Sequence, residues 1–353
     1  MARLRRVDCS GPGITRVKRG KGFEYRDEEG NRILDHDVLS RISELVIPPA
    51  WKDVWICPYP MGHIQATGVD DRGRKQYLYH QAWRERRDRQ KFDDMVAFAR
   101  DLPTLRERVR AILEDGEKIS RDRVLACAVR LLDRGFFRIG SEDYAVTNET
   151  YGLATMRKEH VRLEPEDSMV FDYPAKSGVR RVQDVVDPLS YEIVAALKRR
   201  RGGGAELLAY RAGRRWRDIR SPDINAFIKE VTGGDHSAKD FRTWNATLLA
   251  AVALAVSGEV ADTKTGRKRA VTRAIKEVAG YLGNTPAVCR ASYVDPRVVD
   301  RYQGGVIIRP ALEEVAEEMH PGMLPIHHRA VEEAVLDLLT GGDAGASGLE
   351  KVA

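Results

Sequence analysis

The sequence predicts an α+β protein in which a small, mostly β N-terminal domain precedes a larger, mainly α-helical domain that contains a β-hairpin. Three observations support this fold class. Short extended runs separated by turn residues fill roughly the first 80 residues. Apolar residues then recur at helical spacing from about Trp83, and residues 161–182 return to an alternating pattern.

The N-terminal domain is expected to span residues 1–89. Its extended runs end at clusters rich in Gly, Pro, Asn and Asp, at residues 20–22, 29–31, 58–60 and 71–73. Such clusters are typical of the turns between short strands. A run of mixed charges at 84–89 marks the change to helical periodicity, so we place the domain boundary near Arg89.

The second domain is expected to span residues 90–340 and to be mainly α-helical. Apolar residues between 124 and 132 form one helical face, which Gly135 ends. Residues 161–182 predict a hairpin with its turn at 176–178. Two stretches rich in Gly and Arg, 198–204 and 211–217, are expected to be solvated loops, and 341–353 a disordered tail.

Composition excludes several classes of protein. With 42% hydrophobic and 32% charged residues the chain is neither wholly disordered nor fibrous, and its net charge of +6 indicates a polyanionic partner only weakly. The longest apolar stretch, 248–256, is too short to cross a membrane. No secretory signal pattern is visible, and the four cysteines form no C-x-x-C motif, so we expect a cytoplasmic protein.

Residues 72–80 combine cations with Gln and Tyr on a predicted strand. Gln76 and Leu78 would face one way and Tyr77 and Tyr79 the other. Cations suit phosphates, and Gln can pair with an adenine edge in the major groove. The alternative is an exposed edge strand protected by charged residues.

Four further segments, at 137–142, 174–178, 239–246 and 283–297, carry residues suited to phosphate chemistry. Each has a structural explanation when taken singly. Arg138 and Arg242 suit ordinary ion pairs, Lys176 suits a solvated turn, and Asn284 precedes a helix start at Thr285-Pro286.

Taken together and in this order, the segments resemble the type IB DNA topoisomerases, especially the compact bacterial and poxvirus-like branch of the eukaryotic-like family. The strings Arg-Ile-Gly-Ser-Glu at 138–142, Phe-Arg-Thr-Trp-Asn-Ala at 241–246 and Ser-Tyr-Val-Asp-Pro-Arg at 292–297 are its most specific parts. The resemblance implies the DNA breaking-rejoining fold and a C-shaped clamp of two domains around duplex DNA, acting as a monomer. It implies a catalytic set of Arg138, Lys176, Arg242, Asn284 and Tyr293, and DNA contacts by Arg72, Arg74, Lys75, Gln76, Tyr77, Tyr79, Ser141 and Tyr144.

These residue types fit the chemistry that the resemblance implies. Two guanidinium groups can neutralise a pentacoordinate phosphorane while Tyr293 attacks, and Lys176 can protonate the departing 5′ oxygen. The expected activity is relaxation of positive and negative supercoils through a 3′-phosphotyrosyl intermediate, strand rotation and religation. No Walker loop, H-E-x-x-H or acidic metal cluster is visible, so we expect no cofactor, ATP or metal.

The sequence departs from the family pattern at two places, and two alternatives remain. Many relatives carry His where this chain has Asn284, and a Gly before the lysine where this chain has Ala175. A tyrosine site-specific recombinase would show H-x-x-R at the second arginine, but here Lys239 occupies the histidine position. A catalytically silent DNA-binding clamp would not need the five catalytic side-chain types.

Overall fold

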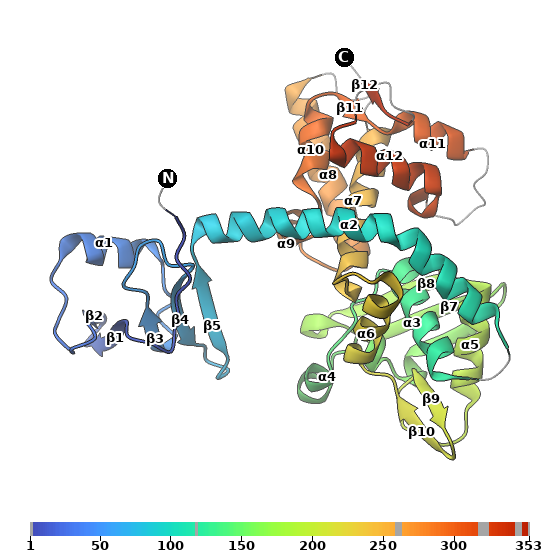
Figure 1. Ribbon diagram of the computed structural model, residues 1–353, viewed down its shortest axis with the longest axis horizontal. Coiled ribbons are helices and arrows are strands. Elements are labelled where there is room, and N and C mark those ends of the chain that lie inside the picture. Colours follow the sequence, from blue (N-terminus) through green and yellow to red (C-terminus); the bar gives the residue numbers. More distant parts are fainter. Residues whose placement is uncertain (1–2, 117–118, 258–262, 317–324, 343–347, 352–353) are drawn as a thin grey trace. The chain divides into compact units, whose positions relative to one another are not determined.

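The computed structural model describes residues 3–116, 119–257, 263–316, 325–342 and 348–351 (Figure 1). The chain forms two compact units, Met1–Lys91 and Phe92–Ala353, which divide two residues beyond the predicted boundary at Arg89. The fold class is α+β, with an antiparallel sheet in the first unit and a mainly helical second unit. In the described ranges, no helix has both the length and the apolar composition needed to span a bilayer.

The N-terminal unit is a five-stranded antiparallel sheet with one helix. Its strand order is β2-β1-β3-β4-β5. Asp35 begins helix α1 (His36–Glu44) by accepting the backbone N–H groups of Asp37 and Val38, and the buried Ile42 of α1 packs with Ile14 and Ile56 of the sheet. The strands are β1 (Ile14–Arg19), β2 (Gly22–Arg26), β3 (Lys52–Ile56), β4 (Ile64–Val69) and β5 (Lys75–Tyr79).

Strand β5 lies at the edge of this sheet and alternates as the sequence predicted. Gln76 and Leu78 are half-buried, whereas Lys75, Tyr77 and Tyr79 are exposed. The rings of Tyr77 and Tyr79 stack, with their centroids 6.0 Å apart. The edge therefore presents two aromatic rings and a cation on one face.

The second unit, which contains the five residues that the resemblance implies to be catalytic and which we therefore call the catalytic unit, is built around helix α7 (Ala238–Val256). Most of the α7 side chains are buried, and α7 packs against helices on several sides, α3 and α8 among them. The helices are α2 (Gln81–Glu114, whose buried residues begin at Phe92), α3 (Arg121–Gly135), α4 (Glu142–Asn148), α5 (Pro188–Arg199), α6 (Ser221–Thr232), α8 (Lys264–Leu282), α9 (Pro286–Ser292), α10 (Pro296–Gln303), α11 (Arg309–Ala316) and α12 (Arg329–Thr340).

A three-stranded antiparallel sheet, in the order β6-β7-β8, lies within the catalytic unit and confirms the predicted hairpin. Met169, Phe171 and Tyr173 of β7 are buried, which agrees with their predicted common face. The short 3-10 turn η3 (Lys176–Gly178) joins β7 to β8. The strands are β6 (Val161–Glu164), β7 (Ser168–Pro174) and β8 (Arg180–Val186).

Two predictions of irregular structure were wrong. Most of residues 211–217, predicted to be a solvated loop, belong to a second hairpin of β9 (Ala209–Ala212) and β10 (Arg215–Asp218). The predicted disordered tail contains β12 (Glu350–Lys351), which pairs with β11 (Val306–Ile307), and the adjacent Leu349 is 4% exposed. Burial of that leucine orders the chain there, although its composition resembles that of a tail.

Candidate active site

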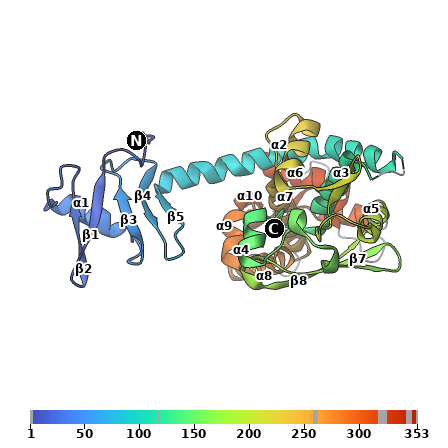
Figure 2. The same cartoon turned by 90° about the horizontal axis from the view of Figure 1, so that it is seen from below.

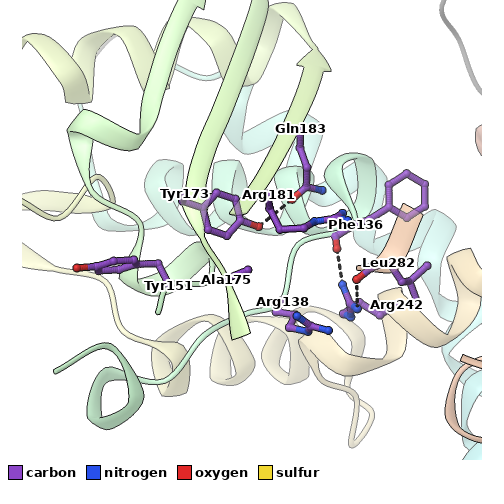
Figure 3. A pocket seen from close by; sticks show the side chains of 9 residues that line it. All are labelled: Phe136, Arg138, Tyr151, Tyr173, Ala175, Arg181, Gln183, Arg242 and Leu282. Carbon is purple, nitrogen blue, oxygen red and sulfur yellow. Dashed lines mark hydrogen bonds between the residues drawn. The ribbon is translucent and has the colours of Figure 1, made fainter. Parts of the chain in front are cut away.

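A small cavity in the catalytic unit collects three arginines from three different elements (Figure 3). Arg138 follows helix α3, Arg181 lies on β8 and Arg242 lies in the first half of α7. The lining residues are Phe136, Arg138, Tyr151, Tyr173, Ala175, Arg181, Gln183, Arg242 and Leu282.

Arg242 is held from two sides by backbone carbonyl groups. Its guanidinium donates to the carbonyl oxygen of Phe136 and, over 2.9 Å, to that of Leu282 (Figure 3). The side chain is buried, and its Nε–H has no partner among the described residues. The pKa of Arg242 is lowered to about 10, chiefly by burial; Tyr293 opposes the shift and the nearby Arg138 adds to it. The group therefore remains cationic at neutral pH.

Arg138 is positioned by a close approach of two chain segments. Leu153 donates its backbone N–H to the Arg138 carbonyl oxygen over 2.8 Å, and Ala154 donates to Ile139 over 2.7 Å. The segments touch because Gly152 has no side chain: a Cβ there would lie 2.4 Å from the backbone nitrogen of Gly140. The Arg-Ile-Gly string therefore packs backbone against backbone with the segment that contains Gly152, and this packing fixes the orientation of Arg138.

The Arg138 guanidinium reaches the end of helix α8. Its Nη2 donates to the carbonyl oxygen of Gly283 over 2.8 Å and to the side-chain oxygen of Asn284. Because arginine can only donate, the Asn284 amide must turn its oxygen toward it. The Asn284 Nδ2 is buried and has no partner among the described residues. Asn284 therefore offers an unused donor beside the cavity.

Tyr293 lies next to Arg242. The guanidinium carbon of Arg242 is 5.2 Å from the centroid of the half-buried Tyr293 ring. Helix α9 begins at Thr285, whose hydroxyl accepts the Val288 backbone N–H, and Tyr293 is the first residue after it. Short helix α9 therefore separates Asn284 from Tyr293.

Helix α7 also fixes the backbone around Tyr293. The Thr247 hydroxyl oxygen accepts the backbone N–H of Asp295 over 3.2 Å and lies 3.3 Å from the Tyr293 carbonyl oxygen. Asp295 is fully buried, begins helix α10 and forms an ion pair with Arg297 at 2.7 Å. One helix thus carries Arg242 and holds the segment that carries Tyr293.

Lys176 is not among the residues that line the cavity. It lies in the exposed turn η3, and its side chain makes no hydrogen bond or ion pair within the described part of the chain. Ser177 and Gly178 adopt positive φ values of 68° and 73°, which give the tight turn its shape. The neighbouring Ala175 does line the cavity, so Lys176 lies at its edge.

Sequence reasoning missed Arg181 as a member of the site. Its guanidinium donates to the carbonyl oxygens of Gly280 and Tyr281, over 2.9 and 2.6 Å, and burial lowers its pKa. Together, these three arginines donate hydrogen bonds to all four backbone carbonyl oxygens of residues 280–283: Arg181 binds the first two, Arg242 the third and Arg138 the fourth. The available signal was the alternation on β8, which turns Arg181 and Gln183 to the same side as the buried Val185.

The N-terminal candidates for DNA contact are organised around Asp70. Its carboxylate accepts the side chains of Arg74 and Gln76, each over 2.9 Å, and the backbone N–H of Arg72 over 3.0 Å. The hydrogen bond from Arg74 is the main cause that lowers the pKa of Asp70 to about 2. Lys75 points its ammonium toward the ring of Tyr77, at 5.7 Å from the centroid.

The two remaining candidates lie at helix α4 in the catalytic unit. Ser141 is exposed and begins α4 without a side-chain cap, so its hydroxyl is available. Tyr144 lies on α4, but its side chain is outside the described residues. Within the described ranges, no three His, Cys, Asp or Glu side chains cluster as a metal site requires.

Sequence comparisons agree with this geometry. A family model described as "Eukaryotic DNA topoisomerase I, catalytic core" matches residues 80–308, and "Bacterial DNA topoisomerase IB, N-terminal domain" matches residues 22–70. The first match covers more than half of the chain and contains the cavity and Tyr293. The chain belongs to the type IB DNA topoisomerase family.

The relatives differ in how much of their own length aligns with this chain. DNA topoisomerase 1B of Acanthamoeba polyphaga mimivirus is 29% identical over 300 residues, which cover 82% of this chain and 88% of that protein. DNA topoisomerase 1 of Candidozyma auris is 32% identical over 163 residues, or 44% of this chain and 20% of that protein. The Drosophila melanogaster enzyme is 29% identical over 157 residues, which cover 15% of its length. The chain therefore spans most of the viral relative but only a fifth or less of these two cellular ones.

Proposed function

We propose that this enzyme relaxes positive and negative supercoils by cleaving one DNA strand through Tyr293, allowing rotation and resealing the strand. The observation that carries the proposal is that Arg242 lies beside the Tyr293 ring and lines the same cavity as Arg138, which in turn holds the Asn284 amide with its donor unused. Membership of the topoisomerase family favours this activity over site-specific recombination and over a silent clamp.

In the proposed reaction the Tyr293 oxygen attacks a backbone phosphorus atom. The new O–P bond forms a 3′-phosphotyrosyl ester, the P–O5′ bond breaks, and its electron pair leaves with the 5′ oxygen. The tyrosine proton must be lost during the attack, which takes place next to the Arg242 cation.

Charge on the transition state would be stabilised by donors that are already in place. Arg242 Nε and Asn284 Nδ2 are buried without partners among the described residues, and a buried unpaired donor is costly. A phosphoryl oxygen would accept hydrogen bonds from both donors. These hydrogen bonds would strengthen as negative charge develops on that oxygen in the transition state. Arg138 holds the Asn284 amide in the required orientation.

Lys176 would protonate the departing 5′ oxygen. Its exposed position at the tip of the β7–β8 turn suits a group that meets the leaving strand only when DNA is bound. This scheme needs neither ATP nor a metal ion, because the phosphotyrosyl ester conserves the energy of the broken bond and the guanidinium groups supply the positive charge.

The N-terminal unit would contact the same duplex as part of a monomeric clamp. Tyr77, Tyr79 and Lys75 project from one face of β5, and Arg72, Arg74 and Gln76 surround Asp70. Such cations suit the phosphates and Gln suits a base edge. Ser141 and Tyr144 would contact the duplex from the catalytic unit.

The deciding experiment uses supercoiled plasmid, EDTA and no ATP. We expect relaxed topoisomers of both signs and, after a detergent stop, a covalent protein–DNA adduct. Tyr293→Phe should abolish both, whereas the same change at the exposed Tyr281 should abolish neither. Relaxation by Tyr293→Phe at the normal rate, or a strict metal requirement, would overturn the mechanism, and strand exchange between two defined sites would identify a recombinase.

A further inference from the structure

The β9–β10 hairpin and the residues before it form an exposed cationic surface, which we call the basic hairpin (residues 199–201 and 209–218). It projects from one edge of the catalytic unit (Figure 1). None of its exposed arginines forms an ion pair within the described part of the chain. These arginines are Arg199, Arg201, Arg211, Arg214, Arg215 and Arg217.

Three exposed arginines elsewhere in the catalytic unit illustrate the usual pairing with an acid. Arg110 binds Glu114 at 2.7 Å, Arg180 binds Asp172 at 2.6 Å and Arg329 binds Glu333 at 2.6 Å. The basic hairpin instead carries six exposed arginines and one exposed acid, Asp218, so its cations are not balanced locally and repel one another. A polyanion that binds there would relieve this repulsion and release its own counterions.

The hairpin is anchored firmly enough to act as a preformed surface. The buried Arg200 donates to the carbonyl oxygens of Leu197 and Leu207, over 3.1 and 2.8 Å. Its guanidinium carbon lies 5.5 Å from the centroid of the Trp216 ring, which sits opposite Arg211 in the strand pair. A rigid surface binds with a smaller loss of conformational entropy.

The base of the hairpin is connected to the wall of the cavity. Tyr151 lines the cavity, and the guanidinium carbon of Arg157 lies 5.1 Å from the Tyr151 ring centroid. Arg157 forms a β-bridge with Glu206, and Leu207 donates its backbone N–H to Met156 over 2.6 Å. Each hairpin strand has four residues, about 13 Å, which is shorter than the roughly 34 Å of one DNA turn. A duplex whose phosphate enters the cavity is therefore close to this base.

We propose that the basic hairpin binds the phosphate backbone of the same duplex, on the flank of the cleaved step, and contributes affinity but not catalysis. The inference rests on the proposed function only for the location of the cleaved phosphate. A nucleic acid fits better than an acidic protein, because arginines spread over two strands and the preceding segment match a regular array of phosphates.

The test compares two triple variants that lose the same net charge. Arg214, Arg215 and Arg217 are changed to Gln in one, and the exposed Arg108, Arg110 and Arg329 in the other. Two of the control arginines lie on α2, which runs along the opposite side of Figure 2 from the β8 label. Binding is measured against salt with a duplex of about one turn (~10 base pairs) and with one of about four turns.

On the long duplex, the hairpin variant should reduce the slope of log K against log salt by up to about 2.7, because each lost phosphate contact contributes about 0.9. The control variant should leave most of the slope unchanged. On the short duplex the two variants should bind alike. Single-turnover cleavage at saturating protein should proceed at the wild-type rate in both.

Three results would overturn the inference. Equal behaviour of the two variants on the long duplex would show that the hairpin makes no DNA contact and leave an acidic polypeptide as its partner. If the hairpin variant reduced the salt slope equally on the short and the long duplex, the contacts of the hairpin would lie at the cleaved step. The wild type could bind a second long duplex that the hairpin variant does not bind. That result would show that the hairpin holds another DNA molecule. Failure of the wild type to relax plasmid in EDTA would instead reject the proposed function, independently of these binding results.

Discussion

Arg138 donates to the side-chain oxygen of Asn284 and so leaves the amide nitrogen of that residue buried and unpaired. The pair is formed by segments 146 positions apart in the sequence. An arginine thereby orients a neutral hydrogen-bond donor beside the cavity. The consequence for catalysis can be tested directly.

Asn284→Ala should slow strand cleavage about 10²–10³-fold, the usual effect of removing one donor to a developing oxyanion. Asn284→Asp keeps the acceptor for Arg138 and removes the donor, so it should be at least as slow. Asn284→His should retain activity below about pH 6.5, where imidazole is charged, and lose part of it above that pH. Single-turnover cleavage between pH 5 and 9 measures all three, and wild-type cleavage by Asn284→Ala would refute the role of the amide.

Arg181 should act as a positioning residue. It donates to Gly280 and Tyr281, directly before the turn that Arg138 and Arg242 hold. A Cβ on Gly283, which has φ of +62°, would lie 2.8 Å from Arg181, so the contact also restricts that turn. Arg181→Met should reduce the cleavage rate about 10–100-fold while changing DNA affinity little, because misplacement of a site costs about that much.

The matched control for Arg181 is its neighbour on the other face of β8. Arg180 is exposed and, among the residues that the structure describes, pairs only with Asp172, so Arg180→Met should change cleavage less than about twofold. Arg181→Lys, which can reach one carbonyl, should recover part of the rate. If both methionine variants cleave equally, or if Arg181→Met loses affinity instead of rate, the positioning role is wrong.

Lys176→Ala should slow cleavage about 10²–10⁴-fold on ordinary DNA, the range expected for loss of a general acid. A 5′-bridging phosphorothiolate has a sulfur leaving group that needs no proton, so the variant should cleave that substrate nearly as fast as the wild type. The ratio of the two rates is the measurement. Equal slowing on both substrates would exclude proton donation by Lys176.

His327 should make the stability of the catalytic unit depend on pH. Burial lowers the pKa of His327 to about 4, and its Nδ1 has no partner within the described residues. Between about pH 6.5 and 4 the unfolded chain binds a proton that the folded chain does not. The free energy of unfolding should therefore fall as the pH falls through this window, by up to about 3 kcal/mol.

Urea unfolding at several pH values tests this prediction. His327→Leu should flatten the dependence between about pH 6.5 and 4, whereas the same change at His36, whose side chain is almost fully exposed, should not. The comparison uses the slopes with pH, since the two changes differ in packing. An unchanged slope in His327→Leu would assign the pH dependence to other groups.

The sequence by itself predicted the elements whose signals are local. Alternation located the β7–β8 hairpin and the two faces of β5, helical spacing and Gly135 located the end of α3, and Thr285-Pro286 marked the start of α9. Motif order along the chain was enough to indicate the family and to nominate Arg138, Arg242 and Tyr293. These signals are local because they depend on backbone geometry within a few residues.

Only the tertiary structure decided which side chains meet. Arg181 lies in none of the sequence motifs that nominated the site. It joins the site because β8 lies beside the last turn of α8, about 100 residues later in the chain. Leu349 is buried because β12 pairs with β11, although its neighbours are typical of a disordered tail. Such contacts depend on packing between distant segments, and that packing also decides which polar atoms, such as Asn284 Nδ2, are left without a partner.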